Sequence, residues 1–374
     1  METLIKLGLK LLRLTKITRI TRKFGRFLAL FLVGAFLTGA IAACGSSTNT
    51  ANTSSPAAGS PKPDVELTLV SFAVTKEAYT GIIPKFTAKW KQEQNQNVTF
   101  KQSYGGSGSQ TRAVLDGLEA DIVHLSLEPD TARIEKAGLI DPGWQKEFPN
   151  EGIVSKSVGA IIVRNGNPKG IKTWADLGKE GVAVVTADPK TSGGARWNIL
   201  ALWGSVTKTG GNETKATQLI SQVIKNAPAL PKDAREASDA FLKKEQGDVL
   251  INYENEVILA NIKGEKTEYV VPDVNVSIDN PIAVVDKNVA KHNNKEVAEA
   301  FVKYLYTPEA QTEFAKVGFR PVEETVAKQK EFTDKFPAIK TLFTAKDLGG
   351  WDAINKQFFT EGALFDKVAS EVRK

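Results

Sequence analysis

The chain has 374 residues, of which 41% are hydrophobic and 25% are charged, a composition typical of a soluble globular protein large enough for two domains. Its formal net charge is +6, yet residues 1–43 hold eight Lys or Arg residues and a single Glu, so the remaining residues carry a net −1. The basic charge therefore belongs to the N-terminal segment and gives no argument for nucleic-acid binding by the folded part of the chain.

The N-terminal segment has the order of a secretory signal peptide: a basic stretch up to Arg26, an apolar stretch at residues 27–43, and small residues before Cys44. Residues 41–44, IAAC, resemble the bacterial lipobox, which implies cleavage before Cys44 and lipidation of this residue, the only cysteine in the chain. The alternative is an uncleaved membrane anchor. In both cases we expect the folded part in the periplasm or at the outer face of the cytoplasmic membrane.

Residues 44–63 contain no large apolar side chain, so we expect a flexible tether there. Beyond it, strand and helix patterns alternate. Strands are expected at 65–73, 98–103, 120–126, 158–164, 182–186, 248–253, 268–271 and 282–285. Helices are expected at 75–92 (with a kink or break at Pro84), 109–118, 129–137, 173–177, from 195 onward, 213–225, 233–243, 255–262, 296–306, 308–317, 323–332 and 351–359. This alternation predicts an α/β fold with mainly parallel sheets flanked by helices.

Two loops rich in Ser and Gly each follow an expected strand and precede an expected helix. They are the first glycine loop (residues 104–110, YGGSGSQ) and the second glycine loop (residues 188–194, DPKTSGG). The first N–H groups of a helix have no partner within it, glycines let a ligand approach the backbone, and the helix dipole adds about half a positive charge. We therefore expect two lobes that hold one anion between them. The alternative is two unrelated turns.

The sequence contains no conventional catalytic or metal-binding set. His124 lies in an apolar run and is expected to be a packed core residue, whereas His292 lies in a polar turn far along the chain. Zinc-ligand spacing, a nucleophile elbow and a Walker loop are all missing from the sequence. Carboxylates such as Asp121, Asp248 and Glu254 are expected to be solvated or to cap helices. We therefore expect a binding protein that is not an enzyme and that uses no metal or cofactor.

Several segments together resemble the sulfate/thiosulfate-binding proteins of bacterial ABC transporters. They are YGGSGSQ (104–110), LEADIVHLS (118–126), DPKTSGGARWNILALWG (188–204), GDVLINYENE (247–256), AEAFVKYLYTPEAQ (298–311) and FRPV (319–322). The resemblance implies a type II periplasmic-binding-protein fold, with two α/β lobes joined by two crossing segments. We assign residues 64–160 and 275–374 to lobe I and residues 161–274 to lobe II.

The resemblance also implies a function, namely an extracytoplasmic sulfate receptor that delivers sulfate to a membrane ABC permease for uptake. We expect a monomer, held at the membrane through Cys44, with no nucleic-acid partner. A thiosulfate-preferring receptor and an oxyanion sensor for a membrane signalling partner are the alternatives with the same binding chemistry. An enzyme acting on phosphate or sulfate esters would need a metal cluster or a nucleophile–base pair, which the sequence does not offer.

The family's ligand contacts are carried over motif by motif. The implied donors are the serine of the first glycine loop, the serine and glycines of the second, and a backbone N–H at the start of the KDAR helix. These residues are Ser107, Ser192, Gly193, Gly194 and Ala234. Arg196 and Arg235 follow these contacts, and they either support the loops from behind or are ordinary surface or ion-paired arginines.

Two further positions depart from the family's pattern. Ala73 stands where the family often has an aspartate, but that aspartate contributes mainly a backbone N–H, which alanine retains. Tyr253 stands where the family has a tryptophan that donates its indole N–H. The Tyr253 hydroxyl either donates to the anion with a different reach or only packs the cleft wall. A site made of donors alone suits sulfate, which has no proton near neutral pH, and should bind phosphate poorly.

Overall fold

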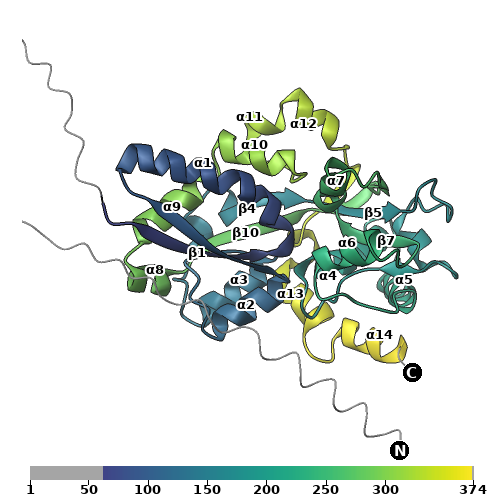
Figure 1. The fold of residues 1–374 in the computed structure, drawn as a ribbon. Coiled ribbons are helices and arrows are strands. Elements are labelled where there is room, and N and C mark those ends of the chain that lie inside the picture. The colour runs from purple at the N-terminus through teal and green to yellow at the C-terminus, as the bar shows by residue number, and fades with distance from the viewer. Residues whose placement is uncertain (1–61, 373–374) are drawn as a thin grey trace, which may run out of the picture. The chain divides into compact units, whose positions relative to one another are not determined.

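The computed structural model describes residues 62–372, which form mixed α/β structure with two main sheets (Figure 1). The predicted signal peptide, Cys44 and residues 44–61 of the predicted tether lie outside the described residues. In the described part of the chain, no helix is both long and apolar enough to cross a membrane.

The first sheet has five strands in the order β2-β1-β3-β10-β4. The strands are β1 (Val65–Phe72), β2 (Val98–Gly105), β3 (Ile122–His124), β4 (Ile153–Ser157) and β10 (Ile278–Val284). β1 pairs in parallel with β2 and β3, whereas β10 runs antiparallel to β3 and β4. The expected parallel sheet is therefore present, with one reversed strand that returns late in the sequence.

Helices cover both faces of the first sheet (Figure 1). α1 (Lys76–Gln94) and α9 (Lys295–Tyr304) pack on the face that carries Leu67 and Leu69. α2 (Ser107–Leu115) and α3 (Glu128–Lys136) pack on the face that carries Val70. Side chains alternate between the two faces of a strand, so β1 contributes to both cores. α1 continues through Pro84 instead of breaking there.

The second sheet has four strands in the order β6-β7-β5-β8. The strands are β5 (Gly159–Val163), β6 (Val184–Val185), β7 (Val249–Tyr253) and β8 (Glu268–Val270). The flanking helices are α4 (Gly193–Thr207), α5 (Glu213–Lys225), α6 (Ala234–Leu242) and α7 (Glu254–Ile262). β6 pairs in parallel with β7, while β5 runs antiparallel to β7 and β8. Each sheet therefore forms the centre of one lobe and contains a single reversed strand.

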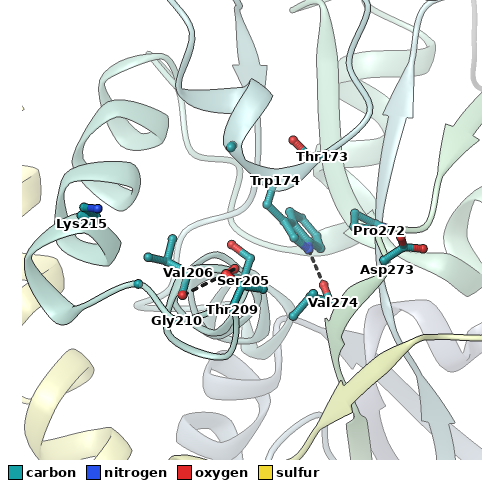
Figure 2. Close-up of a pocket in the computed structure, with 12 residues that line it drawn as sticks. Thr173, Trp174, Ser205, Val206, Thr209, Gly210, Lys215, Pro272, Asp273 and Val274 are labelled. Carbon is teal, nitrogen blue, oxygen red and sulfur yellow. Dashed lines mark hydrogen bonds between the residues drawn. The ribbon is translucent and has the colours of Figure 1, made fainter.

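Two chain segments connect the sheets, and they are tied to each other. Residues 157–159 lead from β4 into β5, and β9 (Val274–Val276) leads back towards β10. Asn275 accepts the Gly159 N–H at 3.1 Å and donates to the Gly159 carbonyl at 2.8 Å. Trp174, in the short 3-10 helix η4 (Trp174–Gly178), donates its indole N–H to Val274 O at 2.9 Å (Figure 2). The crossing segments thus form one hydrogen-bonded unit between the lobes.

The chain ends in a run of short elements. They are α8 (Asp286–His292), α10 (Pro308–Lys316), α11 (Glu324–Ala327), α12 (Lys330–Lys335), β11 (Thr341–Phe343), 3-10 helix η5 (Lys346–Leu348), α13 (Gly350–Ile354), π-helix η6 (Asn355–Phe359) and α14 (Leu364–Val372). Trp351 packs edge-on against Trp197 of α4, and α14 lies against α5. Parts of α13 and α14 therefore contact helices of the second sheet. The predicted lobe I includes all of 275–374, and these lobe boundaries stay a prediction.

Candidate anion-binding site

The second glycine loop is held in shape before α4 begins. Ser192 is the N-cap residue, with extended backbone (φ −106°, ψ 121°), and its Oγ accepts the N–H of Ala195 at 3.4 Å. The carbonyl of Asp188 accepts the N–H groups of Thr191 at 3.1 Å and of Ser192 at 2.8 Å. Because the Ser192 hydroxyl acts here as an acceptor, its own hydrogen remains available to a further acceptor.

The first glycine loop leads into α2 with a different arrangement, because its serine already donates to a carboxylate. The Oγ of Ser107 donates to Oδ2 of Asp130 at 2.6 Å and accepts the N–H of Ser126 at 3.0 Å. Asp130 is buried, and its Oδ1 has no hydrogen-bond partner among residues 62–372. Burial raises the pKa of Asp130, while the nearby Arg196 opposes that shift. Donation from the Ser107 hydroxyl to an anion would require it to leave Asp130.

The two glycine loops contact each other and their surroundings closely, which explains why residues 106 and 193 are glycines. A Cβ on Gly106 would lie 2.5 Å from the carbonyl oxygen of Thr191, and a Cβ on Gly193 would lie 2.6 Å from Cβ of Ser126. Both distances are shorter than real Cβ contacts allow. The N–H of Gly108 also donates to Thr191 O at 3.1 Å. The lobes are therefore in direct contact across the cleft, and glycine is the residue that permits this approach.

A small cavity lies where the loops meet, with about 10 Å³ open to the centre of a water molecule. It is lined by all seven predicted ligand-binding residues: Ala73, Ser107, Ser192, Gly193, Gly194, Ala234 and Tyr253. The other lining residues, which the sequence alone did not indicate as contacts, are Phe72, Val74, Gly105, Gly106, Ser126 and Asp233.

Four helices begin at this cavity. Ser107 opens α2, Gly193 opens α4, Ala234 opens α6, and Tyr253 immediately precedes α7. Each helix N-terminus carries roughly half a positive charge on its unpaired N–H groups. The described residues that line the cavity include no Lys or Arg. Backbone dipoles therefore supply the positive potential in this cavity, beside the carboxylate of Asp233, and helix N-termini arranged in this way bind anions without a salt bridge.

Tyr253 packs against the cavity wall and also brings a hydroxyl to it. Its ring lies 6.0 Å from that of Phe72, and it occupies the space that a Cβ on Gly194 would need. Its hydroxyl lies 2.6 Å from Oγ of Ser126, and either oxygen can be the donor. Burial raises the pKa of Tyr253 well above its ordinary value, so the phenol keeps its proton at neutral pH.

Both predicted supporting arginines lie behind the cavity and bond to its surroundings. Arg196 donates from Nε to the carbonyl of Pro189 at 2.9 Å, within the second glycine loop. Its guanidinium lies 5.2 Å from the ring centroid of Phe359. Arg235 donates from Nη2 to Oε1 of Glu256 at 2.8 Å, at the start of α7. Arg196 thus bonds to the loop itself, while Arg235 forms an ion pair with the helix that follows Tyr253.

The histidines are placed away from the cavity lining. His124 is buried, and its Nδ1 pairs with the hydroxyl of Tyr79 at 2.7 Å. The predicted packed core residue is therefore confirmed, and burial lowers the pKa of His124 to about 3. His292 lies between Asp121 (2.7 Å) and Glu119 (3.0 Å) at the far end of the first sheet. Between residues 62 and 372, no group of three or more His, Cys, Asp or Glu is arranged to hold a metal ion.

A wider surface pocket lies between η4, the C-terminal end of α4 and the residues before β9 (Figure 2). None of the seven predicted ligand-binding residues lines it. Its hydroxyls from Ser205 and Thr209 already donate to backbone carbonyls, at 2.7 Å and 2.8 Å. Neither hydroxyl is therefore free to donate to a ligand in this pocket.

Comparison with known proteins points to one family. The description of the matching family model is "Bacterial extracellular solute-binding protein", and the match covers residues 67–320. The chain is 58% identical to the sulfate-binding protein of Synechococcus elongatus over 89% of this chain and 93% of that protein. It is 38% identical to the thiosulfate-binding protein of Pseudomonas aeruginosa over 80% of this chain and 91% of that protein. The solved sulfate-binding protein of Mycobacterium tuberculosis matches with a TM-score of 0.72 and 38% identity, covering 79% of this chain and 99% of that one.

Proposed function

This chain belongs to the bacterial extracellular solute-binding proteins, in their sulfate- and thiosulfate-binding group, and from that premise we propose that its closed cavity encloses a sulfate ion. The receptor then delivers sulfate to an ABC-type permease. One observation carries the proposal: the N-termini of α2, α4, α6 and α7 converge on the cavity that all seven predicted contacts line.

The donors that we assign to the anion are mostly backbone groups. They are the N–H groups of Ala73, Gly193, Gly194 and Ala234, together with the hydroxyl of Ser192. The N–H groups of the three later residues lie in the first turns of α4 and α6, where the helix leaves them without an internal partner. A dianion held in this way gains from several dipoles at once and needs no buried cation.

The same arrangement disfavours hydrogen phosphate, whose proton needs an acceptor. Asp233 lines the cavity, but its Oδ1 accepts the N–H of Glu236 at 2.9 Å and caps α6. Asp130 does not line the cavity, and its Oδ2 accepts the Ser107 hydroxyl. We propose that the anion lies against the helix N-termini and away from Asp233, where a fully ionised anion such as sulfate meets N–H and O–H donors. Thiosulfate satisfies the same rule and stays the alternative ligand, as the name of the Pseudomonas aeruginosa relative suggests.

Calorimetric titration of the purified full-length chain, kept in detergent, tests the ligand. We expect saturable binding of sulfate and no binding of phosphate at the concentration that saturates with sulfate. Tryptophan emission gives a second readout, because the Trp197 indole of lobe II donates to the Ser126 carbonyl of lobe I at 2.9 Å. Absence of binding by both sulfate and thiosulfate, or equal binding of phosphate, would overturn the proposal.

We propose that the lobes move about the crossing segments, with lobe I at 64–160 and 275–374 and lobe II at 161–274. The hydrogen-bonded pair Gly159 and Asn275 lies at these boundaries and supports this division. A ligand that contacts both lobes favours the closed state by its differential contacts. Small-angle scattering should therefore show a smaller radius of gyration with saturating sulfate, and an unchanged profile despite binding would contradict the division.

The family is extracellular, which places this protein outside the cytoplasm. We further propose that it lies in the periplasm or at the outer face of the cytoplasmic membrane, that cleavage before Cys44 and lipidation anchor it there, and that it acts as a monomer. Cys44→Ser should release the protein from membranes or leave the uncleaved precursor. An intact mass showing cleavage elsewhere, with a free thiol at Cys44, would contradict the anchor.

Uptake of labelled sulfate in a strain that lacks this protein separates transport from sensing. We expect uptake to fall in the deletion strain and to return when the full-length chain is supplied. Unchanged uptake, together with sulfate binding by the purified chain, would favour the sensor. We propose no catalytic step for the chain in either case.

A further inference from the structure

The hydroxyls of Ser126 and Tyr253 meet at the cavity from opposite lobes. Ser126 follows the end of β3 in the first sheet, and Tyr253 is the last residue of β7 in the second. Their oxygens lie 2.6 Å apart, both residues are buried, and both line the cavity. In the described part of the chain, neither hydroxyl makes any other hydrogen bond.

The number of hydrogens in this pair matters. Two hydroxyls carry two hydrogens, and the bond between them uses only one. Whichever oxygen donates, the other keeps an O–H group with no acceptor among residues 62–372. Leaving a buried donor unused is unfavourable. The remaining hydrogen is therefore available to whatever occupies the cavity.

The other polar groups of Ser126 are already committed. Its N–H donates to Ser107 Oγ at 3.0 Å, and its carbonyl accepts the Trp197 indole at 2.9 Å and the Asn280 amide at 3.1 Å. The hydroxyl hydrogen of Ser107 is committed as well, since it is directed at Asp130. Backbone and neighbours thus hold Ser126 in place, and its hydroxyl is the one polar group that can still respond to a ligand.

We propose that Ser126 and Tyr253 act together as one shared hydrogen-bond donor to the bound anion, an inference that rests on the proposed function. With the anion in place, Ser126 donates to the phenolic oxygen and Tyr253 donates to an anion oxygen. Phenol is the more acidic hydroxyl, with an ordinary pKa of about 10, so it is the better partner for a dianion, and the bond from serine polarises it further. If one hydroxyl is removed, the other still lines the cavity and donates in its place.

The shared donor also links anion binding to closure of the lobes. Its two halves come from different sheets, so they meet only when the lobes are in contact. In an open receptor, each hydroxyl would be separate and hydrated. The anion would then meet the polarised donor only in the closed state, which adds to the differential affinity that shifts a receptor towards closure.

A double-mutant cycle in the full-length chain tests the pair. The proteins are the parent, Ser126→Ala, Tyr253→Phe and the double variant, each titrated calorimetrically with sulfate and with thiosulfate. We expect each single variant to bind less than about fivefold more weakly, because the remaining hydroxyl takes over the donation. The double variant should bind roughly 10- to 100-fold more weakly, and by more than the product of the two single losses, since it loses the whole charged hydrogen bond.

Tyr306→Phe is the matched control, because it removes a buried phenol that has no hydrogen-bond partner in the described part of the chain. Its affinity should equal that of the parent. The shared donor would be overturned if a single variant lost more than about tenfold in affinity, or if the double variant bound no more weakly than the weaker single variant. Either result would show that the two hydroxyls only join the lobes to each other. A double loss equal to the product of the single losses would overturn it too. A parent that binds neither anion overturns the proposed function itself.

Discussion

The two glycine loops are alike in sequence and unlike in what lies behind them. Each brings a serine to the cavity at the start of a helix. Behind the first loop is a buried carboxylate, Asp130, which takes the hydrogen of Ser107. Behind the second is Arg196, which bonds to the loop carbonyl of Pro189 and leaves the Ser192 hydrogen free. The serine of such a loop can therefore donate to a ligand or be occupied by a protein acceptor, depending on which side chain lies behind the loop.

This difference predicts an unequal division of binding free energy. An anion near the second loop meets free N–H groups and a hydroxyl, with a guanidinium in the layer behind. An anion near the first loop meets the α2 N-terminus, with a carboxylate in the layer behind. We therefore expect substitutions in the second loop to weaken binding more than the matching substitutions in the first.

Gly193→Asp should have the largest effect. It places a carboxylate beside a dianion, and its Cβ would lie 2.6 Å from Cβ of Ser126, so the lobes could not approach as they do here. The loss of sulfate affinity should exceed the roughly 100-fold expected for one charged hydrogen bond. Calorimetry measures it, and circular dichroism checks that the variant is folded.

Gly108→Ala is the matched control in the first loop. Its added Cβ would lie 3.4 Å from Thr191 O, close to an ordinary contact, and it introduces no charge. We expect sulfate affinity within a few-fold of the parent. A large loss of sulfate affinity in Gly108→Ala, or near-parent affinity in Gly193→Asp, would contradict the proposal that the second loop contributes more to binding than the first.

The serines give the second test. Ser192→Ala removes an available hydroxyl and should weaken sulfate binding roughly 10- to 100-fold. The melting temperature should change little, because the capping bond that it loses is long, at 3.4 Å. Ser107→Ala should weaken binding less, but it should lower the melting temperature, because it leaves the buried carboxylate of Asp130 without its one hydrogen-bond donor among residues 62–372. Equal binding losses with equal stabilities would contradict the comparison.

Much of the fold was predictable where structure is local. The predicted helix 213–225 is α5 with the same bounds, because its apolar residues repeat at helical spacing and Asn212 caps it. β4 was not predicted, since its short segment pairs with β10, more than a hundred residues away. The predicted helix 323–332 is divided into α11 and α12. Long-range pairing and short irregular elements leave little periodic pattern in the sequence.

The residues that bring backbone N–H groups to the site were predictable from the sequence, whereas the side chains that support them were less so. Glycines and serines before helices indicate close backbone approach, and the structure brings all seven predicted residues to one cavity. Ser126 and Asp130 were not indicated, because their roles depend on which side chains meet across the fold. The ADIVHLS run that ends at Ser126 was the available signal, since it places a serine at the carboxyl end of a buried strand.

Asp130→Asn should have a smaller, pH-dependent effect. Burial raises the pKa of Asp130 in the folded protein above the ordinary value of about 3.9, so the folded state holds this proton more tightly than the unfolded state. The contribution of Asp130 to stability is therefore most favourable below about pH 4 and is lost as pH rises through the raised pKa. In the parent, sulfate affinity should also increase as pH falls towards that pKa, because protonation removes a negative charge near the dianion.

The asparagine variant keeps an acceptor for Ser107 and has no charge to titrate. We expect it to bind sulfate as tightly as the parent or severalfold more tightly at neutral pH, with a flatter pH profile of both affinity and stability. Calorimetry and thermal melts between pH 4 and 8 measure both profiles. Weaker binding with an unchanged pH profile would show that the carboxylate does not act on the anion.

The smallest effect should come from the C-terminal segment that contacts the second loop. Asp366 of α14 pairs with Lys190 at 2.9 Å and accepts the N–H of Gly362 at 3.0 Å. The lysine side chain is 63% exposed, so solvent screens the pair, and exposed pairs contribute only about 0–1 kcal/mol. Asp366→Asn removes the charge but keeps an acceptor for Gly362. We expect a loss of sulfate affinity within about threefold, diminishing as salt rises. A loss as large as that of Ser192→Ala would mean that the loop is shaped mainly from its surface, and not by Arg196 beneath it.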